Sequence, residues 1–265
     1  MNGWFQHNGV GLHWREDGNP AGAPLLLLNS LGTDLRLWDP VLPALADHRV
    51  IRMDTRGHGL SDAPAGTYTL ASLTDDALGL VRHLGPTKLT VIGVSLGGMM
   101  AQALAVQAPD IVQRVVLSNT AQRMGTPEMW AERVDAVRSR GVASIADAIL
   151  DRWFAPGFRN GDSIDLWRNM LIRTPAEGYA GCCAALAAAD LSDKAPRISC
   201  PALVIGGSDD GASPPDVVRA LADAIPNATY TEIEGVGHLP MAEAPERFVA
   251  PVRDFLKEPA RAGQA

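Results

Sequence analysis

The sequence has no excess of positive charge and no long apolar segment, and both absences argue against certain classes of partner. Its 23 lysines and arginines are outnumbered by 30 aspartates and glutamates, so the formal net charge is −7. A protein that binds nucleic acid normally carries a basic surface, which this composition does not favour. No apolar run approaches the ~20 residues of a membrane-spanning helix, and the N-terminus lacks the basic and apolar parts of a signal peptide. We therefore expect a cytoplasmic protein that binds neither nucleic acid nor a membrane.

Cysteine is scarce as well. The chain has three, Cys182, Cys183 and Cys200, and an odd number with one adjacent pair does not make a disulfide framework. The Cys182-Cys183 pair could suggest a metal site, but no second Cys or His pair accompanies it at ligand spacing. We therefore interpret these cysteines as small buried side chains and predict no bound metal.

The chain does have a regular alternation of strand-like and helix-like segments. With 265 residues, 46% of them hydrophobic, it can form one large α/β domain. Strands and helices alternate up to residue 119 and again from 201 to 256, which indicates a mostly parallel sheet with helices on both faces. The segment between these parts contains only helix-like stretches. We therefore predict a core domain formed by residues 1–119 and 196–265, and a helical cap, residues 120–195, at the carboxyl edge of the sheet, where ligands bind.

One stretch joins a strand to a helix through a serine. Leu89 to Val94 is apolar and rich in branched side chains, as in a buried strand, and Met99 to Ala105 consists mostly of good helix formers. Between them, Gly93-Val94-Ser95-Leu96-Gly97 matches G-x-S-x-G, the nucleophile elbow. Glycines on either side of the serine remove Cβ atoms that would clash in so sharp a turn. We predict that Ser95 is a catalytic nucleophile at the positive end of the following helix.

A serine nucleophile needs a base, and the base needs an acid that orients it. In enzymes with a nucleophile elbow the order along the chain is serine, acid, histidine, and His238 is the only histidine after Ser95. His58, in a glycine-rich loop before the elbow, is the rival and is interpreted as structural. Two adjacent aspartates, Asp209 and Asp210, come at the end of a later strand, and the pattern G-x-x-D-x-x-S-P favours Asp210 as the acid.

The tetrahedral intermediate of such a reaction needs two backbone donors for its oxyanion. The N–H of Leu96, directly after the nucleophile, is one of them. The loop after the first buried strand should supply the other, and Leu31 is the best candidate. A second polar loop, residues 54–59, is expected at the same edge of the sheet, where it would brace the site with Arg56 paired to Asp54.

Five stretches of the sequence form a recognisable set: NSLGTDLRLWD, DTRGHGLSDAP, GVSLGGMMAQ, GYAGCCAALAAADL and GHLPMAEAPERF. With them the chain resembles the α/β-hydrolases over nearly its whole length, and among these the 3-oxoadipate enol-lactonases of aromatic-compound degradation, in the β-ketoadipate pathway. One departure is Asn29-Ser30, where most α/β-hydrolases carry His-Gly. The resemblance implies that water opens the enol-lactone of 3-oxoadipate, a small anionic substrate, through a serine acyl-enzyme and without a metal or cofactor.

An anionic substrate requires a local cation, because the net charge of −7 would repel it at long range. The predicted cap supplies several arginines: Arg123, Arg133, Arg138, Arg140 and Arg152. Trp130, Arg133 and Val137 share one face of a helix by their spacing. We predict that Arg133 binds the substrate carboxylate with its planar guanidinium, and that Trp130 and Trp153 contribute to the substrate site.

Three other functions are compatible with the same residues. Two use the same triad: a general carboxylesterase or perhydrolase, and a hydrolase that cleaves C–C bonds. The third belongs to another class, a non-catalytic ligand receptor on this fold, which would bind its ligand with negligible steady-state turnover. The serine at position 95, where haloalkane dehalogenases and epoxide hydrolases carry an aspartate, argues against those two chemistries.

Overall fold

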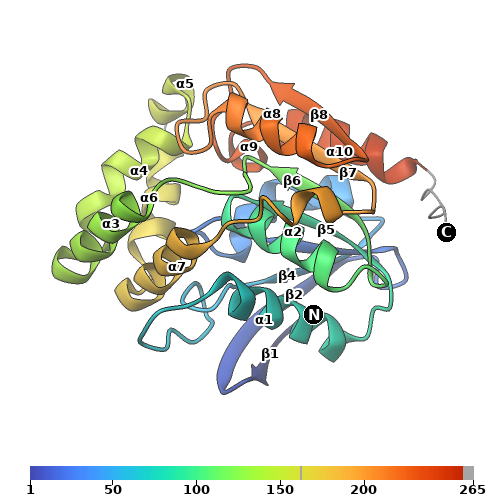
Figure 1. Cartoon of the computed structure of the whole chain (residues 1–265), viewed down its shortest axis with the longest axis horizontal. Helices are drawn as coiled ribbons and strands as arrows, with labels where there is room; N and C mark the ends of the chain where they lie inside the picture. Colours follow the sequence, from blue (N-terminus) through green and yellow to red (C-terminus); the bar gives the residue numbers. More distant parts are fainter. Residues whose placement is uncertain (162, 259–265) are drawn as a thin grey trace.

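The computed structural model describes residues 1–161 and 163–258. They form an eight-stranded sheet in the order β1-β2-β4-β3-β5-β6-β7-β8 (Figure 1). β2 pairs antiparallel with β1 and β4, and the other neighbouring strands are parallel, so the prediction of a mostly parallel α/β sheet is confirmed. The strands are β1 (Asn2–His7), β2 (Val10–Gly18), β3 (Pro24–Leu28), β4 (Arg49–Met53), β5 (Leu89–Val94), β6 (Val112–Ser118), β7 (Ala202–Gly207) and β8 (Ala228–Ile233).

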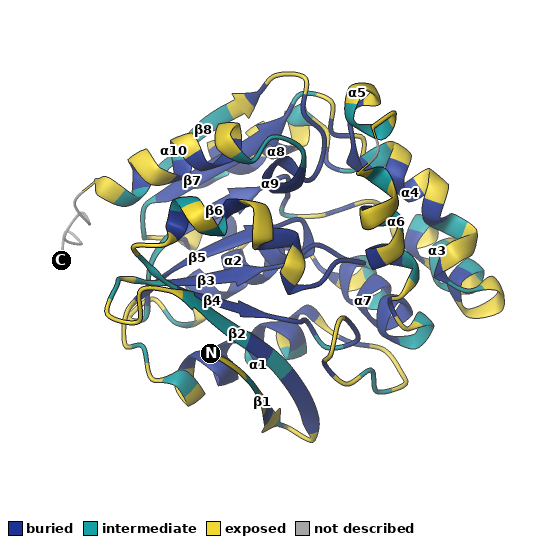
Figure 2. Cartoon of the chain, turned by 180° about the vertical axis from the view of Figure 1, so that it is seen from behind, coloured by how far each residue is buried: buried dark blue, intermediate teal, exposed yellow. Residues whose placement is uncertain are grey.

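The centre of the sheet is the most buried part of the molecule. All six residues of β5 are buried, as are the four leucines of β3. A parallel strand covered on both faces needs apolar side chains on both sides, which explains why these segments are continuous apolar runs. The edge strands β1 and β8 carry exposed residues (Figure 2). The serine that follows β5 is therefore held by a fully buried strand at the centre of the sheet.

Helices cover this sheet. α2 packs on β5 and β6, α1 packs on α2, α8 packs on β7 and β8, and α10 packs on η1 and β8. η1 is a 3-10 helix that contains Pro40 and Pro43, and the missing N–H of each proline interrupts the hydrogen-bond ladder of a regular α-helix. The bounds are η1 (Leu35–Leu45), α1 (Leu70–Leu84), α2 (Leu96–Gln107), η3 (Ala195–Arg197), α8 (Pro215–Ala224), α9 (Pro240–Glu243) and α10 (Pro245–Lys257).

The chain between β6 and β7 forms helices that gather on one side of the sheet, on the left in Figure 1. α3 packs against α7, and α4 packs against α6. That residues 120–195 form a cap distinct from the core stays a prediction. The bounds are α3 (Pro127–Arg140), η2 (Val142–Ile145), α4 (Ala146–Trp153), α5 (Pro156–Arg159), α6 (Ile164–Ile172) and α7 (Ala176–Ala188). Among the described residues, no helix is both long and apolar enough to cross a lipid bilayer.

Candidate active site

Ser95 stands in the sharp turn between β5 and α2. Its φ and ψ of 57° and −119° lie in a region that residues other than glycine rarely adopt. The flanking glycines make the turn possible: a Cβ on Gly93 would lie 2.2 Å from the carbonyl oxygen of Gly97, and a Cβ on Gly97 would lie 2.2 Å from that of Leu28. The G-x-S-x-G pattern is thus required by the packing of the turn, and the serine is 4% exposed.

The carboxylate of Asp210 is surrounded by donors. Its Oδ2 is 2.8 Å from His238 Nδ1 and accepts a hydrogen bond of 2.9 Å from Asn119 Nδ2. Its Oδ1 accepts from the backbone N–H groups of Ala212 and Ser213, at 2.7 and 2.9 Å. These bonds orient the carboxylate so that it faces the imidazole. Its neighbour in sequence is exposed and accepts instead from Ser208 Oγ, so Asp210 is the aspartate that contacts the histidine.

Asn119 is part of this arrangement, and the sequence reasoning missed it. Its φ of 48° is left-handed. Besides Asp210, its Nδ2 donates to the carbonyl of Gly237 at 3.2 Å, and its Oδ1 accepts from Ser118 Oγ at 2.7 Å. It therefore links the loops that carry Asp210 and His238. The available signal was a polar Ser-Asn pair at the carboxyl end of a buried strand, where ligand-binding groups of parallel sheets gather.

The loop of His238 is held by groups from two other segments. The His238 N–H donates a hydrogen bond of 2.7 Å to the carbonyl of Trp153, at the end of α4. The preceding N–H, of Gly237, donates to Glu243 Oε2 at 2.9 Å, and the same carboxylate accepts from the Ala155 N–H. Burial raises the pKa of Glu243, and these two N–H groups partly oppose that rise. The histidine loop is therefore bonded directly to the last residue of α4 and, through Glu243, to the segment that follows.

The two predicted oxyanion donors are Leu31, in the loop after β3, and Leu96, the first residue of α2. Among the described residues, the N–H groups of Leu31 and Leu96 meet no acceptor, while the next N–H, that of Gly97, donates to the Asn29 carbonyl at 3.0 Å. Asn29 is fully buried: its side chain donates to the Met53 carbonyl at 2.7 Å and accepts from Trp38 Nε1 at 2.8 Å. Asn29 stands where most α/β-hydrolases are expected to carry histidine. It has a structural role here, because it anchors the start of the loop that carries Leu31.

A cavity next to Ser95 and His238 is lined by side chains of both core and helical segment. Among its lining residues are Leu31, Trp130, Arg133, Arg152, Trp153 and Tyr179. It measures about 40 Å³, which is room for only a few waters. Met124 and Met129 also line it, and these flexible side chains are suited to moving aside for a larger ligand. All three cap residues predicted to contact a substrate therefore reach this cavity.

Two arginines, Arg133 and Arg152, line this cavity. The Arg133 guanidinium stacks 4.9 Å above the Trp130 ring, and Arg152 Nε donates to the Gly211 carbonyl at 2.8 Å. Burial lowers the pKa of Arg152, and the nearby charge of Arg133 lowers it further. Within residues 1–161 and 163–258 neither forms an ion pair with a carboxylate. Together they give this end of the cavity a local positive charge.

Comparison with known proteins identifies the family. A sequence model described as alpha/beta hydrolase fold matches residues 23–245. This chain belongs to the α/β-hydrolase fold family. It is 35% identical over 251 residues to 3-oxoadipate enol-lactonase 2 of Acinetobacter baylyi, a match that covers 94% of each chain.

Solved structures agree with this assignment. The enol-lactonase of Burkholderia xenovorans superposes on this α/β-hydrolase with a TM-score of 0.94 and 42% identity, over 97% of this chain and 100% of that one. An esterase of Thermogutta terrifontis, solved with malate bound, gives a TM-score of 0.90 and 33% identity over 97% and 98%. The chain is therefore an α/β-hydrolase related to enol-lactonases.

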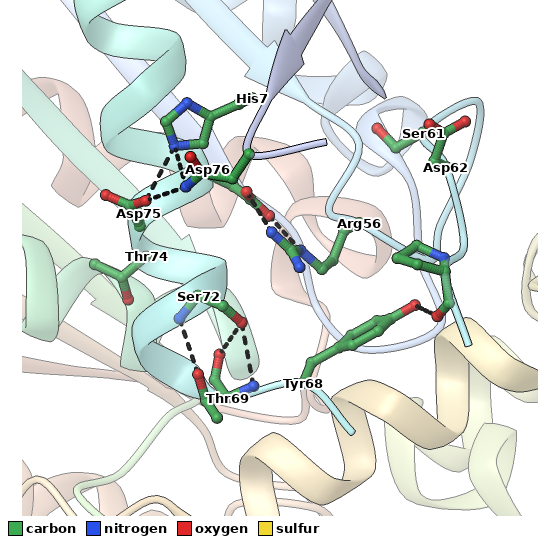
Figure 3. Close-up of polar contacts among 12 residues, drawn as sticks. His7, Arg56, Ser61, Asp62, Tyr68, Thr69, Ser72, Thr74, Asp75 and Asp76 are labelled. Atoms are coloured by element: carbon green, nitrogen blue, oxygen red, sulfur yellow. Dashed lines mark hydrogen bonds and ion pairs between the residues drawn. The ribbon is translucent and has the colours of Figure 1, made fainter. Parts of the chain in front are cut away.

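One prediction about the bracing loop of this α/β-hydrolase is wrong. Arg56 does not pair with Asp54: its Nε and Nη2 each donate at 2.6 Å to the carboxylate of Asp76, on α1 (Figure 3). Asp54 instead accepts from the Leu35 and Leu60 N–H groups and contacts His13 Nδ1. Closeness in sequence did not predict the partner of Arg56, because its side chain turns away from the loop toward α1, which starts later in the chain.

Proposed function

We propose that this α/β-hydrolase opens a small anionic enol-lactone with water, and that the substrate is the enol-lactone of 3-oxoadipate. The observation that carries the proposal is the pair of arginines, Arg133 and Arg152, lining the cavity beside Ser95 in a chain related to enol-lactonases. A neutral ester would gain little from two such charges. A substrate with a carboxylate arm would bind to them through charged hydrogen bonds.

The reaction begins at Ser95. His238 Nε2 takes the hydroxyl proton while Oγ attacks the lactone carbonyl, and Asp210 holds the imidazole through Nδ1. The N–H groups of Leu31 and Leu96 stabilise the oxyanion, and Leu96 adds the positive end of α2. The C–O bond of the ring then breaks, and the enol oxygen leaves with the proton from His238. Because the ring is opened in this step, the leaving group stays attached to the acyl-enzyme as an enol and tautomerises to a ketone.

The second half of the reaction removes the acyl group. His238 accepts a proton from a water molecule, and the hydroxide attacks the ester carbonyl of acylated Ser95. The same two backbone donors stabilise the second oxyanion, and Ser95 leaves with the proton from His238. The products are 3-oxoadipate and free enzyme, so one water is consumed and no redox step occurs.

Arg133 and Arg152 supply the substrate selectivity in this proposal. At long range the net charge of −7 repels an anion, and the two guanidiniums reverse that field close to Ser95. Neither is neutralised by a carboxylate within the described part of the chain. The acetate arm of the enol-lactone would occupy this position, with Trp130 and Trp153 packing against the ring.

The test compares two substrates on one preparation. We expect kcat/KM for the enol-lactone, followed spectroscopically, to exceed that for p-nitrophenyl acetate and butyrate, with Ser95→Ala as the inactive control. Equal or better efficiency on the simple esters would favour a general carboxylesterase, a candidate supported by the 33% identity to an esterase. Tight binding of the lactone without turnover would indicate a receptor.

A further inference from the structure

The loop that carries Leu31 is held from behind by a histidine outside the proposed triad. The Gly32 N–H donates a hydrogen bond of 2.9 Å to His58 Nε2, and His58 Nδ1 lies 3.3 Å from the carbonyl oxygen of Arg56. The His58 residue is 1% exposed. It therefore acts on the peptide next to Leu31 from inside the protein.

The two neighbours of the imidazole determine where its proton lies. A backbone N–H can only donate and a carbonyl can only accept. A neutral His58 with its proton on Nδ1 satisfies both, whereas a proton on Nε2 would point at the Gly32 N–H. Burial lowers the pKa of His58 below its usual 6.5. The ring is thus kept in the one protonation state that accepts from Gly32.

His58 is itself fixed, because its loop is bonded to one helix and packed closely against another. On one side, the Arg56 guanidinium forms its paired hydrogen bonds with Asp76 on α1 (Figure 3). On the other, Gly57 lies so close to α7 that a Cβ on it would be 2.5 Å from Gly178 Cα. The acceptor offered to Gly32 therefore has a fixed position relative to both core and helical segment.

Gly32 has little freedom of its own. Its φ is +79°, and a Cβ there would lie 2.6 Å from Leu171 Cδ1. If its acceptor is removed, a buried N–H is left unpaired, which destabilises this conformation of the loop. The peptide can avoid that destabilisation by rotating toward another acceptor. The Leu31 N–H belongs to the preceding peptide, which is joined to the rotating one at the Leu31 Cα, so we infer that the rotation would also change the direction of that N–H.

We propose that His58, as the neutral Nδ1–H tautomer, is a positioning residue of the oxyanion hole. It aligns the Leu31 N–H through Gly32 and does not contact the substrate. This inference rests on the proposed function, since it assumes that Ser95 forms a tetrahedral intermediate. Its effect should fall on kcat and on the binding of transition-state analogues, with little effect on ground-state binding.

The experiment uses a matched pair of variants. In His58→Gln the side-chain oxygen can reach the place of Nε2, because both atoms are three bonds from Cβ, so an acceptor for Gly32 is retained. In His58→Asn the amide can occupy only the place of Nδ1, so the Arg56 contact is retained and the Gly32 contact is lost. We expect kcat to fall about 10- to 100-fold in His58→Asn, less than the 100- to 1000-fold cost of removing an oxyanion donor. His58→Gln should keep most of the wild-type kcat, because it retains the acceptor for Gly32.

A second measurement distinguishes a misaligned oxyanion hole from a general disruption of the active site. An arylboronic acid adds to a catalytic serine as a tetrahedral adduct, whereas adipate binds without a covalent bond. In His58→Asn the affinity for the boronic acid should fall in parallel with kcat/KM, and the inhibition constant of adipate should stay within about twofold. Equal kcat values in the two variants would overturn the proposal. So would a loss of affinity for adipate as large as the loss of affinity for the boronic acid.

The wild-type protein provides a test that needs no variant. The ¹⁵N shifts of the His58 ring should show a protonated Nδ1 and an unprotonated Nε2, and the ring should stay neutral when the pH falls through 6.5. A proton on Nε2 would overturn the inference even if both variants fail to fold. This measurement is independent of turnover, so failure of the proposed lactonase function, seen as no hydrolysis by the wild type, is distinguishable from failure of this inference.

Discussion

The core and helical sides of the candidate site differ in how their polar groups are satisfied. On the core side, Asp210 has a donor for each of its acceptor positions, and His238 and Asn119 complete a closed network. On the helical side, Arg133 and Arg152 line the cavity with no carboxylate partner in the described residues. A polar group whose hydrogen-bonding positions all have partners is held in one geometry, while a charge without a partner attracts a ligand of opposite charge. In the proposed function, the core side would carry out the reaction and the helical side would recognise the substrate.

The two sides are nevertheless joined at the end of α4. Arg152 exchanges backbone and side-chain bonds with Gly211, next to Asp210: the Gly211 N–H donates to the Arg152 carbonyl, and Arg152 Nε donates to the Gly211 carbonyl. The Trp153 carbonyl accepts from the His238 N–H. Removing the Arg152 side chain would therefore disturb both sides at once. Within the described part of the chain Arg133 forms no hydrogen bond to the core side, so it is the cleaner residue for testing recognition alone.

The largest effect is expected from the residues that would perform the chemistry. Ser95→Ala and His238→Ala should each lower kcat by about 10⁶-fold, because members of a triad act as a unit. Both proteins should remain folded, since neither change removes an anchor of the sheet. The checks are steady-state kinetics, circular dichroism and labelling with a fluorophosphonate, which should modify the wild type and neither variant. Substantial turnover in Ser95→Ala would show that the core side is not where the reaction occurs.

A somewhat smaller effect is expected from the acid. Asp210→Asn should lower kcat by about 10⁴-fold, because an amide does not hold the imidazole in the required tautomer. Asp209→Asn is the matched control: its side chain is exposed and, among the described residues, its carboxylate hydrogen-bonds only to Ser208, so its kcat should change less than threefold. The ratio of the two kcat values measures the effect. The opposite ranking would assign the acid to position 209.

The sequence predicted local motifs well and long-range partners poorly. The turn at Ser95 could be predicted because glycine spacing encodes it directly, and the contact of His238 with Asp210 because His238 is the only histidine after that turn. Asn119 could not, since its bonds reach residues about 90 to 120 positions later. The Arg56–Asp76 pair was mispredicted for the same reason: the choice among several carboxylates depends on where α1 packs. Side-chain partners across elements follow from tertiary packing, which residue spacing does not encode.

Recognition by the helical side is expected to have an intermediate effect. Arg133→Ala should lower kcat/KM for the enol-lactone by about 10- to 150-fold, which corresponds to the 1.5–3 kcal/mol of a charged hydrogen bond. Hydrolysis of p-nitrophenyl acetate should change less than twofold, because that ester has no carboxylate. The comparison of the two substrates is the measurement.

Two further variants sharpen this result. Arg140→Ala removes an exposed charge at the end of the same helix, so it reports the loss of net charge alone and should leave both substrates nearly unaffected. Arg133→Lys should recover part of the loss, because an ammonium keeps the charge but not the planar fork. Equal losses on both substrates in Arg133→Ala would mean that the helix had shifted and that the arginine does not bind the carboxylate.

The smallest effect is expected at the contact between the two sides, where Glu243 accepts from Gly237 and Ala155. Burial raises the pKa of this carboxyl in the folded protein above its usual 4.5. The folded state therefore binds the proton more tightly than the unfolded state, and ionisation of Glu243 destabilises the fold. Its contribution to the free energy of unfolding is most favourable below the unfolded pKa of about 4.5 and declines as pH rises through the raised folded pKa.

Glu243→Gln removes this titration while leaving an oxygen that can accept from Gly237. The free energy of unfolding of the wild type minus that of the variant should therefore decrease as pH rises from about 4.5 to neutrality, by urea denaturation at a series of pH values. Near pH 7 the two proteins should differ by no more than about 1.5 kcal/mol, and kcat should change only a few-fold. Glu246→Gln, an exposed neighbour on α10, should show no such trend. A difference that increases with pH would mean that the hydrogen bonds of the ionised carboxylate stabilise the histidine loop by more than burial destabilises the charge. Glu243 would then resemble Asp210, whose ionised form is held by hydrogen bonds on the core side.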